Sequence, residues 1–406
     1  MNVEVGILTA PLIRFSVPEG RPVQENAGAQ SEISGVSKIL EVTAANVPDE
    51  TIEGPFTLHD VVIGVDFHWQ RTMSQTFAGA LKFVKDGDNV TAVNIIDIED
   101  YLLSVISSEM KATADLEFLK AHAIISRSWL LAQILARRSM PKVRVAVQKL
   151  DRHWHEEGGD AAELVKWFDH EDHKLFDVCA DDHCQRYQGM QMAVGEAVRK
   201  AIDQTRGVVL TYKGNICDAR FHKCCGGRTE RFSACWEDND YDYLRPVDDP
   251  WCDTRDEDIL SKVLNDYDLE TKDFHDWTVR YGSAELSELV RRRSGIDFGT
   301  IIDLEPLERG DSGRIIRLRI VGTEKTLIIG KELLIRRFLS ESHLKSSNFD
   351  IRREGDDFVL TGHGWGHGVG LCQIGAAVMA ANGFSCEQIL SHYYPGAQLT
   401  VYGDEQ

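Results

Sequence analysis

The chain has 406 residues, enough for two or three domains or for one core with large insertions, and its 43% hydrophobic and 27% charged residues are ordinary for a soluble globular protein. Its formal net charge of −20 argues against nucleic-acid binding, which requires a basic surface. No apolar run approaches the roughly 20 residues of a membrane-spanning helix, and residues 1–15 lack the pattern of a secretory signal.

The N-terminal part of the chain is predicted to be β-rich. Short runs at residues 3–8, 61–67 and 89–96 alternate or contain β-branched side chains between glycine and proline breaks. Two helices are expected next, because apolar residues recur at helical spacing over 95–109, with Asp97 as N-cap, and over 116–137.

The rest of the chain mixes both kinds of element, which predicts an α+β fold. The charged segment 142–176 is expected to be a largely helical insertion. Further predicted elements are strands at 208–212, 218–222, 315–321 and 326–329, and helices within 255–300, at 372–382 and at 386–394. The expected division is a β-rich region at 1–90 and a region at 91–400 that holds a second α/β lobe at about 255–345. We expect a substrate cleft between the lobes.

Residues 362–370 read Gly-His-Gly-Trp-Gly-His-Gly-Val-Gly, which no ordinary helix or strand tolerates. Glycine inside such an element costs backbone entropy and packs nothing. We therefore expect positive φ angles and a backbone path that presents His363, Trp365 and His367 at fixed positions. The alternatives are the wall of a substrate groove and a tight loop around a buried tryptophan, and the alternation favours the groove.

Glu109 ends the first predicted helix, whose other face is almost wholly apolar. A carboxylate that emerges from an apolar element into a cleft has its pKa raised by desolvation, as a general acid near neutral pH requires. The alternative is a solvated glutamate near a helix end, which spacing alone favours.

Cysteines are concentrated in one part of the chain. There are nine, and seven of them lie between residues 179 and 252. Cys179, His183 and Cys184, with Cys225 downstream, have the composition of a zinc site, although not its usual spacing. Disulfides, for example Cys179 or Cys184 with Cys225, are the equal alternative, and either would be structural.

Two further histidine pairs lie in the acidic insertion, His153 with His155 and His170 with His173. A second metal site could use them. A solvated insertion helix explains them better, because metal ligands seldom sit among so many unpaired charges.

Two long signatures resemble the SpoIID/LytB family. The match spans about residues 90–400 and rests on these residues: Ile98, Tyr101, Leu102, Val105, Ser108-Glu109-Met110, Leu119-Lys120-Ala121, Ala123, Arg127, Cys184-Gln185, Gly226-Gly227-Arg228-Thr229-Glu230, Tyr243-Leu244-Arg245, Ser312-Gly313-Arg314, the run 362–370, Gln373, Gly375-Ala376 and Tyr393-Tyr394-Pro395-Gly396. The region before residue 90 matches only as a β-rich leader.

This resemblance implies a peptidoglycan lytic transglycosylase that acts on glycan strands stripped of stem peptides, with Glu109 as its single acid and base. It assigns Ser108, Arg127 and Gln373 to the substrate groove. In this reading His363 and His367 bind sugar hydroxyl or acetamido groups, and Trp365 stacks on a pyranose. Metal ligation by the two histidines is the weaker alternative.

The resemblance also bears on cofactors, partners and location. No cofactor is required for catalysis, but some members hold a zinc near the region equivalent to His183-Cys184, which supports a structural zinc. Expected partners are peptidoglycan strands and a cell-wall amidase, and the expected location is the cell envelope, although no export signal is visible. A non-catalytic amidase enhancer is the alternative function, and a zinc hydrolase using His363 and His367 is a third.

Three positions depart from the family pattern. His122 stands where glutamine is usual, Ser128-Trp129 replaces Thr-Tyr, and Cys372 replaces the common serine before Gln373. None of them removes a proposed catalytic group, but they put fine substrate preference in doubt.

Overall fold

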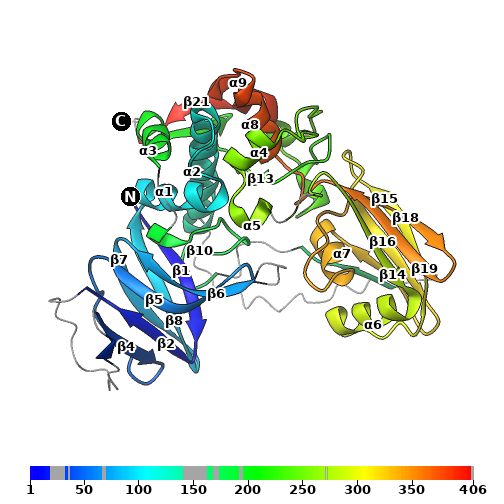
Figure 1. The fold of residues 1–406 in the computed structure, drawn as a ribbon, viewed down its shortest axis with the longest axis horizontal. Coiled ribbons are helices and arrows are strands. Elements are labelled where there is room, and N and C mark those ends of the chain that lie inside the picture. The colour runs from blue at the N-terminus through cyan, green and yellow to red at the C-terminus, as the bar shows by residue number, and fades with distance from the viewer. Residues whose placement is uncertain are drawn as a thin grey trace.

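The computed structural model describes residues 1–18, 33–34, 37–65, 70–139, 162–167, 173–191, 195–269, 271 and 273–403. The fold is mixed α+β, as predicted (Figure 1), and the described residues form two apolar cores. We call the part around the larger core the main body. The second lobe comprises residues 276–363 and strand β9 (Ala162–Val165), and it surrounds the smaller core.

Strands dominate the beginning of the main body. They are β1 (Asn2–Ala10), β2 (Leu12–Ser16), β3 (Ile33–Ser34), β4 (Ser37–Thr43), β5 (Phe56–Ile63), β6 (Arg71–Phe77), β7 (Ala80–Asp86), β8 (Asn89–Asp97) and β10 (Val178–Cys179). They form two sheets, ordered β10-β1-β8-β7 and β3-β4-β2-β5-β6. β10 pairs in parallel with β1, Val178 with Val5 and Cys179 with Gly6, so the start of the loop after β10 is anchored at the edge of this sheet.

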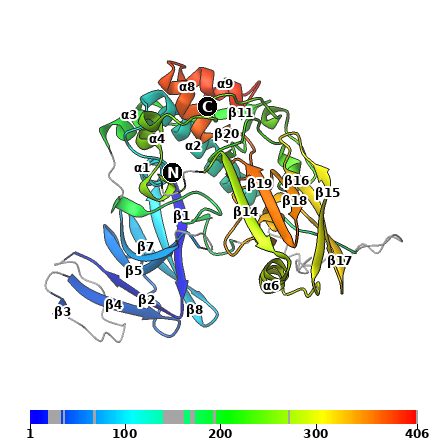
Figure 2. The ribbon, with the colours of Figure 1, turned by 45° about the vertical axis from the view of Figure 1, so that its right-hand side comes forward.

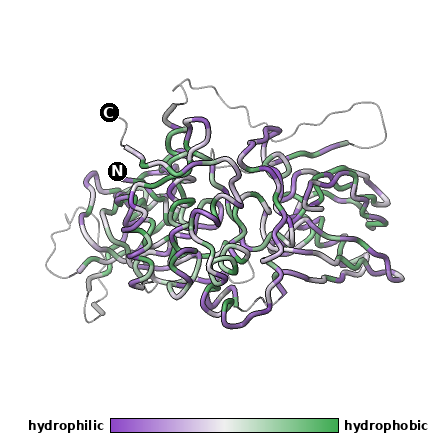
Figure 3. Tube along the Cα trace, turned by 90° about the horizontal axis from the view of Figure 1, so that it is seen from above, coloured by the Kyte–Doolittle hydropathy of each residue, from purple (hydrophilic) through white to green (hydrophobic). Residues whose placement is uncertain are grey.

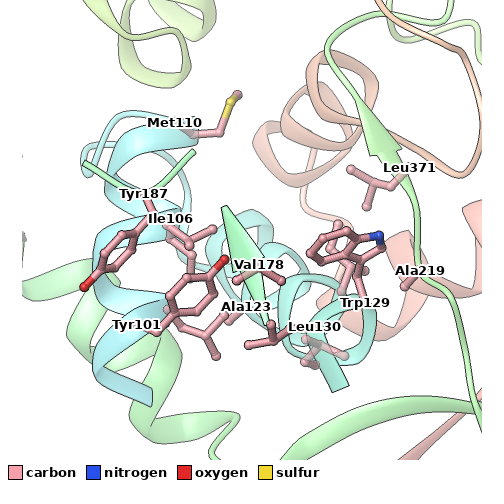
Figure 4. Packing of buried hydrophobic residues seen from close by; sticks show 14 of the residues in the cluster. Tyr101, Ile106, Met110, Ala123, Trp129, Leu130, Val178, Tyr187, Ala219 and Leu371 are labelled. Carbon is pink, nitrogen blue, oxygen red and sulfur yellow. The ribbon is translucent and has the colours of Figure 1, made fainter. Parts of the chain in front are cut away.

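Two helices, α1 (Ile98–Glu109) and α2 (Leu116–Ser139), lie above these sheets and confirm the predicted pair (Figure 1). Asp97 caps α1 as expected, since its carboxylate accepts from the Glu99 amide at 3.0 Å. Apolar side chains from both helices fill the space between them (Figure 4). Nearly all residues of α1 are buried. Glu109, at the C-terminal end of the helix, is the residue of α1 whose side chain reaches the cleft.

Later segments complete the main body. They are the helices α3 (Glu196–Gln204), α4 (Glu257–Val263), α5 (Asp266–Leu269), α8 (Gln373–Ala381) and α9 (Cys386–Tyr393), short 3₁₀ turns at Gly189–Gln191, Phe232–Ala234 and Asp242–Leu244, and strands β11 (Val208–Tyr212), β12 (Asn215–Ile216), β13 (Phe221–His222), β20 (Leu371–Cys372) and β21 (Gln398–Val401). β20 pairs with β13 and β21 with β11. The C-terminal segment thereby returns to the body that contains the N-terminus.

The second lobe is a separate α/β unit beside the main body (Figures 2 and 3). It contains β14 (Asp276–Gly282), α6 (Ser283–Ser294), β15 (Ile301–Arg309), β16 (Ile315–Gly322), β17 (Thr326–Gly330), α7 (Glu332–Phe338), β18 (Phe349–Glu354) and β19 (Asp357–His363). Its sheets are ordered β15-β16-β17-β9 and β14-β19-β18. β19 ends at the start of the glycine-rich run, so this run is the passage from the second lobe back to the main body.

Two element predictions need correction. Residues 255–300 were expected to be helical, but β14 interrupts them, because Trp277 is buried against β19 while its neighbours face outward. The insertion 142–176 was expected to be largely helical, yet residues 162–165 form β9, which pairs in parallel with β17. His153, His155 and His170 lie outside the described residues. No helix among the described residues is both long and apolar enough to cross a membrane.

Candidate active site and metal centre

The glycine-rich run adopts the backbone that its sequence predicts. Gly364, Gly366, Gly368 and Gly370 have φ angles of 76°, 99°, 86° and 73°, which side-chain-bearing residues rarely adopt. At Gly370 a Cβ atom would also lie 2.0 Å from the Arg220 carbonyl oxygen. The run is therefore held against the strand β13 both by its own torsion angles and by close backbone approach.

Glu109 lies at the edge of a cleft of about 400 Å³. Its side chain is 8% exposed, and its two carboxylate oxygens receive hydrogen bonds from different segments. Oε1 accepts from the Arg186 amide at 3.0 Å, and Oε2 lies 3.5 Å from Nε2 of Gln373. Lys223 donates to the Glu109 carbonyl oxygen at 3.3 Å and pairs with the buried Asp268 at 2.7 Å.

Gln373 connects Glu109 to His122, one of the positions that departs from the family pattern. The Gln373 amide nitrogen is 3.0 Å from Nε2 of His122, whose Nδ1 is 3.2 Å from the Ser126 hydroxyl. Burial, with a smaller effect of the Lys223 charge, lowers the pKa of His122 to about 3, so the imidazole is neutral near pH 7. A neutral His122 that accepts from Gln373 at Nε2 carries its proton on Nδ1 and donates to Ser126.

His367 and Trp365 line the same cleft as Glu109, more than 250 residues away in sequence. Burial, followed by the neighbouring His222 and Arg220, holds the pKa of His367 well below its usual value. Its Nδ1 accepts from the Val369 amide at 3.0 Å, which leaves Nε2–H as a donor. Trp365 is only 7% exposed and its backbone pairs with Cys224, so packing is its main role and only an edge is open for a ligand.

Three residues assigned to the groove do not line it. His363 is half-exposed and binds Asp276 of β14 at 2.6 Å from Nδ1. Arg127 is buried in a bidentate ion pair with Glu99, at 3.0 and 2.6 Å, and donates to the Val208 carbonyl. Ser108 donates within α1 and accepts from the Gln188 amide. These three side chains therefore connect secondary-structure elements to one another. A sequence signature cannot distinguish such a structural role from ligand binding.

Sequence reasoning missed most of the other cleft residues. The main body contributes Asp181, Asp182, Arg186, Arg220, His222, Lys223 and Trp236, and the second lobe contributes Glu332, Leu333, Arg336, Arg337 and His343. No second cleft carboxylate was evident from the sequence, but Asp181 and Asp182 lie there. Burial, and then the charge of Asp182, raise the pKa of Asp181 to about 7. No spacing pattern marked these residues, because five different segments bring them together.

Four metal-binding side chains converge next to the cleft. The ligand atoms of His173, Cys179, His183 and Cys184 all lie within 4.8 Å of one another. His183 Nδ1 is 3.2 Å from His173 Nε2 and 3.5 Å from Cys184 Sγ, and His173 Nε2 is 3.3 Å from Cys184 Sγ. A tetrahedral zinc with bonds of about 2.0–2.3 Å places its ligands roughly 3.3–3.8 Å apart. The donor set and these distances fit zinc.

This cluster differs from the prediction in one ligand. Cys225 was expected to belong to it, but Cys225 lies in another cluster, and His173 takes its place. All nine cysteines are free thiols, so the alternative disulfides of Cys225 with Cys179 or Cys184 are not formed. From the sequence, His173 is a candidate only for a separate metal site with His170, and a solvated helix is preferred there, because His173 lies 6 residues before Cys179 in a charged segment, where histidines are ordinarily solvated.

The histidines of the glycine-rich run do not form a metal site. Neither His363 nor His367 belongs to a group of converging metal-ligating atoms within the described part of the chain. One pairs with an aspartate of the second lobe and the other accepts from a backbone amide. The geometry therefore gives no support to a zinc hydrolase built on this pair.

Two families match the chain, one on each side of residue 220. Residues 86–212 match the family described as stage II sporulation protein (SpoIID), and residues 230–370 match a domain of unknown function, DUF8618. The first match includes Glu109 and the cluster of His173, Cys179, His183 and Cys184. The second includes residues 276–363 of the second lobe and the glycine-rich run, whereas β9 of that lobe falls in the first match. The cleft is thus built from both matched regions.

Individual relatives cover more of the chain. Stage II sporulation protein D of Bacillus subtilis (strain 168) is 25% identical over 311 residues, 76% of each chain. An uncharacterized protein of Brachyspira hyodysenteriae is 26% identical over 326 residues, 80% of this chain and 73% of that one. The amidase enhancer of Bacillus subtilis is 27% identical over 233 residues, which are 50% of this chain and 32% of that protein. The resemblance seen in the signatures around Glu109 and His367 is confirmed: this chain carries a SpoIID-family domain and is related to stage II sporulation protein D and to amidase enhancer.

Proposed function

We propose that this protein is a peptidoglycan lytic transglycosylase that cleaves the bond between N-acetylmuramic acid and N-acetylglucosamine in glycan strands without stem peptides. The observation that carries the proposal is the position of Glu109. Its carboxylate is nearly buried, receives donors from Arg186 and Gln373, and shares the cleft with His367 of the glycine-rich run.

The chemistry needs one carboxyl group in two protonation states. Protonated Glu109 donates its proton to the glycosidic oxygen, the bond from that oxygen to the muramic C1 breaks, and positive charge develops at C1. The Glu109 carboxylate then accepts the proton of the muramic C6 hydroxyl as O6 bonds to C1. The product carries a 1,6-anhydro ring, no water is consumed, and Glu109 is protonated again.

Side chains around the cleft support a sugar acid as substrate. Four basic side chains line it, Arg220, Lys223, Arg336 and Arg337, and the first three form ion pairs with Asp218, Asp268 and Glu332. Removal of the stem peptide leaves a free lactyl carboxylate on each muramic acid, which a basic side chain at the cleft attracts. Donation from Nε2 of His367 suits an acetamido or hydroxyl oxygen.

Replacement of Glu109 tests the proposal directly. We expect Glu109→Gln to release no anhydro-muramic ends from denuded glycan strands, while the matched variant Glu387→Gln, at an exposed glutamate outside the cleft, keeps wild-type activity. Mass spectrometry of the products and thermal melting of each variant are the measurements. Normal cleavage by a folded Glu109→Gln protein would refute the role of Glu109. Reducing ends without the anhydro ring would instead indicate hydrolysis, with Asp181 or Asp182 as the first candidates for the base.

The second candidate function is a non-catalytic amidase enhancer, which is favoured by the similarity to a protein of that name. An amidase enhancer would not need the Glu109 carboxylate, whereas a transglycosylase would. An enhancer would stimulate a cell-wall amidase equally well as wild type and as Glu109→Gln, and neither protein would release anhydro ends. Either function implies a location in the cell envelope, where peptidoglycan lies.

We further propose a structural zinc bound by His173, Cys179, His183 and Cys184. When bound, the ion would supply four bonds that fix the loop after β10. This loop leads within two residues to Arg186, whose amide holds Glu109. Zinc analysis of protein purified without chelator, with His183→Ala as comparison, tests the site. A chelator should lower the melting temperature and activity together, whereas activity lost without any change in melting would indicate a catalytic metal.

A further inference from the structure

A second group of metal-binding side chains is fully buried close in sequence to the cleft residues Lys223 and Gln373. It consists of Cys225, Asp249, Cys252 and Cys372, whose ligand atoms all lie within 4.8 Å of one another. The four residues come from three segments: the turn after β13, the loop before α4, and the end of β20. Solvent is excluded from all of them, unlike the cluster of His173, Cys179, His183 and Cys184, which is partly exposed.

The spacing of these atoms suits one tetrahedral ion. Cys225 Sγ is 3.4 Å from Cys252 Sγ and 3.2 Å from Asp249 Oδ2. Zinc–sulfur bonds of about 2.3 Å and zinc–oxygen bonds of about 2.0–2.2 Å separate neighbouring ligands by roughly 3.5–3.8 Å, so these atoms need to move apart by only a few tenths of an ångström to hold the ion. Three sulfur atoms and one carboxylate oxygen are also a donor set that suits zinc and similar soft divalent ions.

Backbone and side-chain donors orient these candidate ligands. Cys372 Sγ accepts from the amides of Cys225 and Gly375, both at 3.4 Å, and Cys252 Sγ accepts from the Gly227 amide at 3.1 Å. Such N–H donors stabilise a thiolate over a thiol. The arrangement is typical of sulfur atoms that are deprotonated and bound to a metal.

The Asp249 carboxylate is likewise oriented by hydrogen-bond donors. Tyr393 donates to its Oδ2 at 2.9 Å and the Trp251 amide to its Oδ1 at 3.1 Å. A Cβ atom on Gly375 would lie 2.2 Å from Asp249 Oδ2, so the helix α8 approaches the carboxylate closely. These contacts fix one orientation of a side chain that is completely buried.

His275 lies beside Cys252 of this cluster, but Asp249 has no basic partner among the described residues. No lysine or arginine within the described ranges forms an ion pair with Asp249, although buried carboxylates are ordinarily paired with a cation or a metal ion. A disulfide between Cys225 and Cys252 would leave the buried Asp249 carboxylate with hydrogen-bond donors from Tyr393 and Trp251 but with no positive charge beside it. One divalent ion compensates all four groups at once.

We propose that Cys225, Asp249, Cys252 and Cys372 bind a second structural metal ion of the zinc class, separate from the ion at His173, Cys179, His183 and Cys184. Cys372 precedes Gln373, the donor to Glu109, and Cys225 follows Lys223 by two residues. The second ion thus joins the two segments that approach Glu109 from this side of the cleft. The departure of Cys372 from the serine usual in the family supplies one of its ligands.

Metal counting on the full chain tests the proposal. Protein purified without chelator and loaded with Zn²⁺ should carry two equivalents by native mass spectrometry, and His183→Ala and Cys252→Ser one equivalent each. Cys217→Ser is the matched control, because Cys217 is equally buried but lies outside both clusters, and it should keep two. A His183→Ala protein that carries no metal would overturn the proposal.

Two further measurements keep the test decisive if Cys252→Ser fails to fold. Co²⁺-loaded His183→Ala should show thiolate-to-cobalt charge-transfer bands and the intense visible bands of tetrahedral cobalt. Their absence would contradict a sulfur-rich site at the remaining cluster. Non-reducing peptide mapping of the zinc-loaded wild type should find Cys225, Cys252 and Cys372 all free, whereas a Cys225–Cys252 disulfide would replace the metal site by a redox pair.

Discussion

The Glu109 carboxylate is held by two donors that both come from distant segments later in the sequence. Arg186 offers a backbone amide 77 residues later, and Gln373 offers a side-chain amide 264 residues later. A backbone donor survives any substitution of its side chain, whereas the donor of Gln373 does not. At this scale Gln373 is therefore the residue through which the Glu109 carboxylate is most easily disturbed.

Gln373→Leu should lower kcat about 10-fold to 100-fold and leave KM nearly unchanged. The substitution keeps the side-chain volume but removes a hydrogen bond to a charged group, worth about 1.5–3 kcal/mol. Steady-state release of anhydro ends measures it, with the exposed Gln398→Leu on β21 as control. A kcat within twofold of wild type would show that Gln373 only packs.

His122 should make stability depend on pH. Its pKa is about 3 in the folded protein because of burial, and about 6.5 when unfolded. Between these values the unfolded chain binds a proton that the folded chain does not, so stability is complete above pH 6.5 and is lost as pH falls.

The expected slope from His122 is about 1.4 kcal/mol per pH unit below roughly pH 6. His122→Gln should flatten the profile of unfolding free energy by this amount, as urea titrations between pH 4.5 and 7.5 can measure. His222 and His343, whose pKa values are likewise lowered to about 3 by burial, contribute equally to both proteins. Identical slopes for the two proteins would contradict a neutral, buried His122.

At the scale of elements, the glycine-rich run depends on backbone conformations and close contacts that only glycine allows. Gly370 and Gly383 both have positive φ angles, 73° and 84°, but only Gly370 is blocked by the Arg220 carbonyl, since nothing lies within 4 Å of a Cβ at Gly383. Gly383→Ala should therefore cost about 1–2 kcal/mol of unfolding free energy, from the left-handed backbone alone.

Gly370→Ala should cost roughly 1–3 kcal/mol more, because β13 must also move away from the run. Urea denaturation of both variants compares them under the same conditions. Equal losses would mean that contact with β13 is loose and that the φ angle alone requires glycine at this position.

Elements with strong local signals were predicted well. Asp97 caps α1, α2 begins at Leu116, and β11 has the predicted bounds, because caps, apolar periodicity and β-branched runs act within a few residues. β9 and β14 were missed because each is a strand only through its partner. β9 pairs with β17 across 160 residues, and β14 pairs with β19.

At the scale of the whole molecule, residues of both the main body and the second lobe line the cleft. The main body supplies Glu109, and α7 of the second lobe supplies Arg337. If the substrate is a denuded strand with free carboxylates, Arg337→Gln should raise KM about threefold to fivefold with little change in kcat, since a partly exposed ion pair contributes up to about 1 kcal/mol.

High salt should remove most of this effect of Arg337→Gln on KM, because partly exposed charges are screened within about 8–10 Å at moderate ionic strength. Arg292→Gln is the matched control on the same lobe, since this exposed arginine pairs with Glu341 and does not line the cleft. An unchanged KM, or a change that high salt does not reduce, would argue against recognition of an anionic substrate by the second lobe.

Local chemistry let the sequence determine the α+β class, the two helices before and after Glu109, the positive φ angles of the glycine-rich run and the family resemblance. Only the tertiary structure decided which assigned residues meet. Trp365, His367 and Gln373 line the same cleft as Glu109, whereas Arg127 is buried in an ion pair with Glu99. In the predicted metal cluster, His173 stands in the place expected for Cys225. The physical reason is that a hydrogen bond or a metal ligand set depends on distance in space, whereas a signature records only order along the chain.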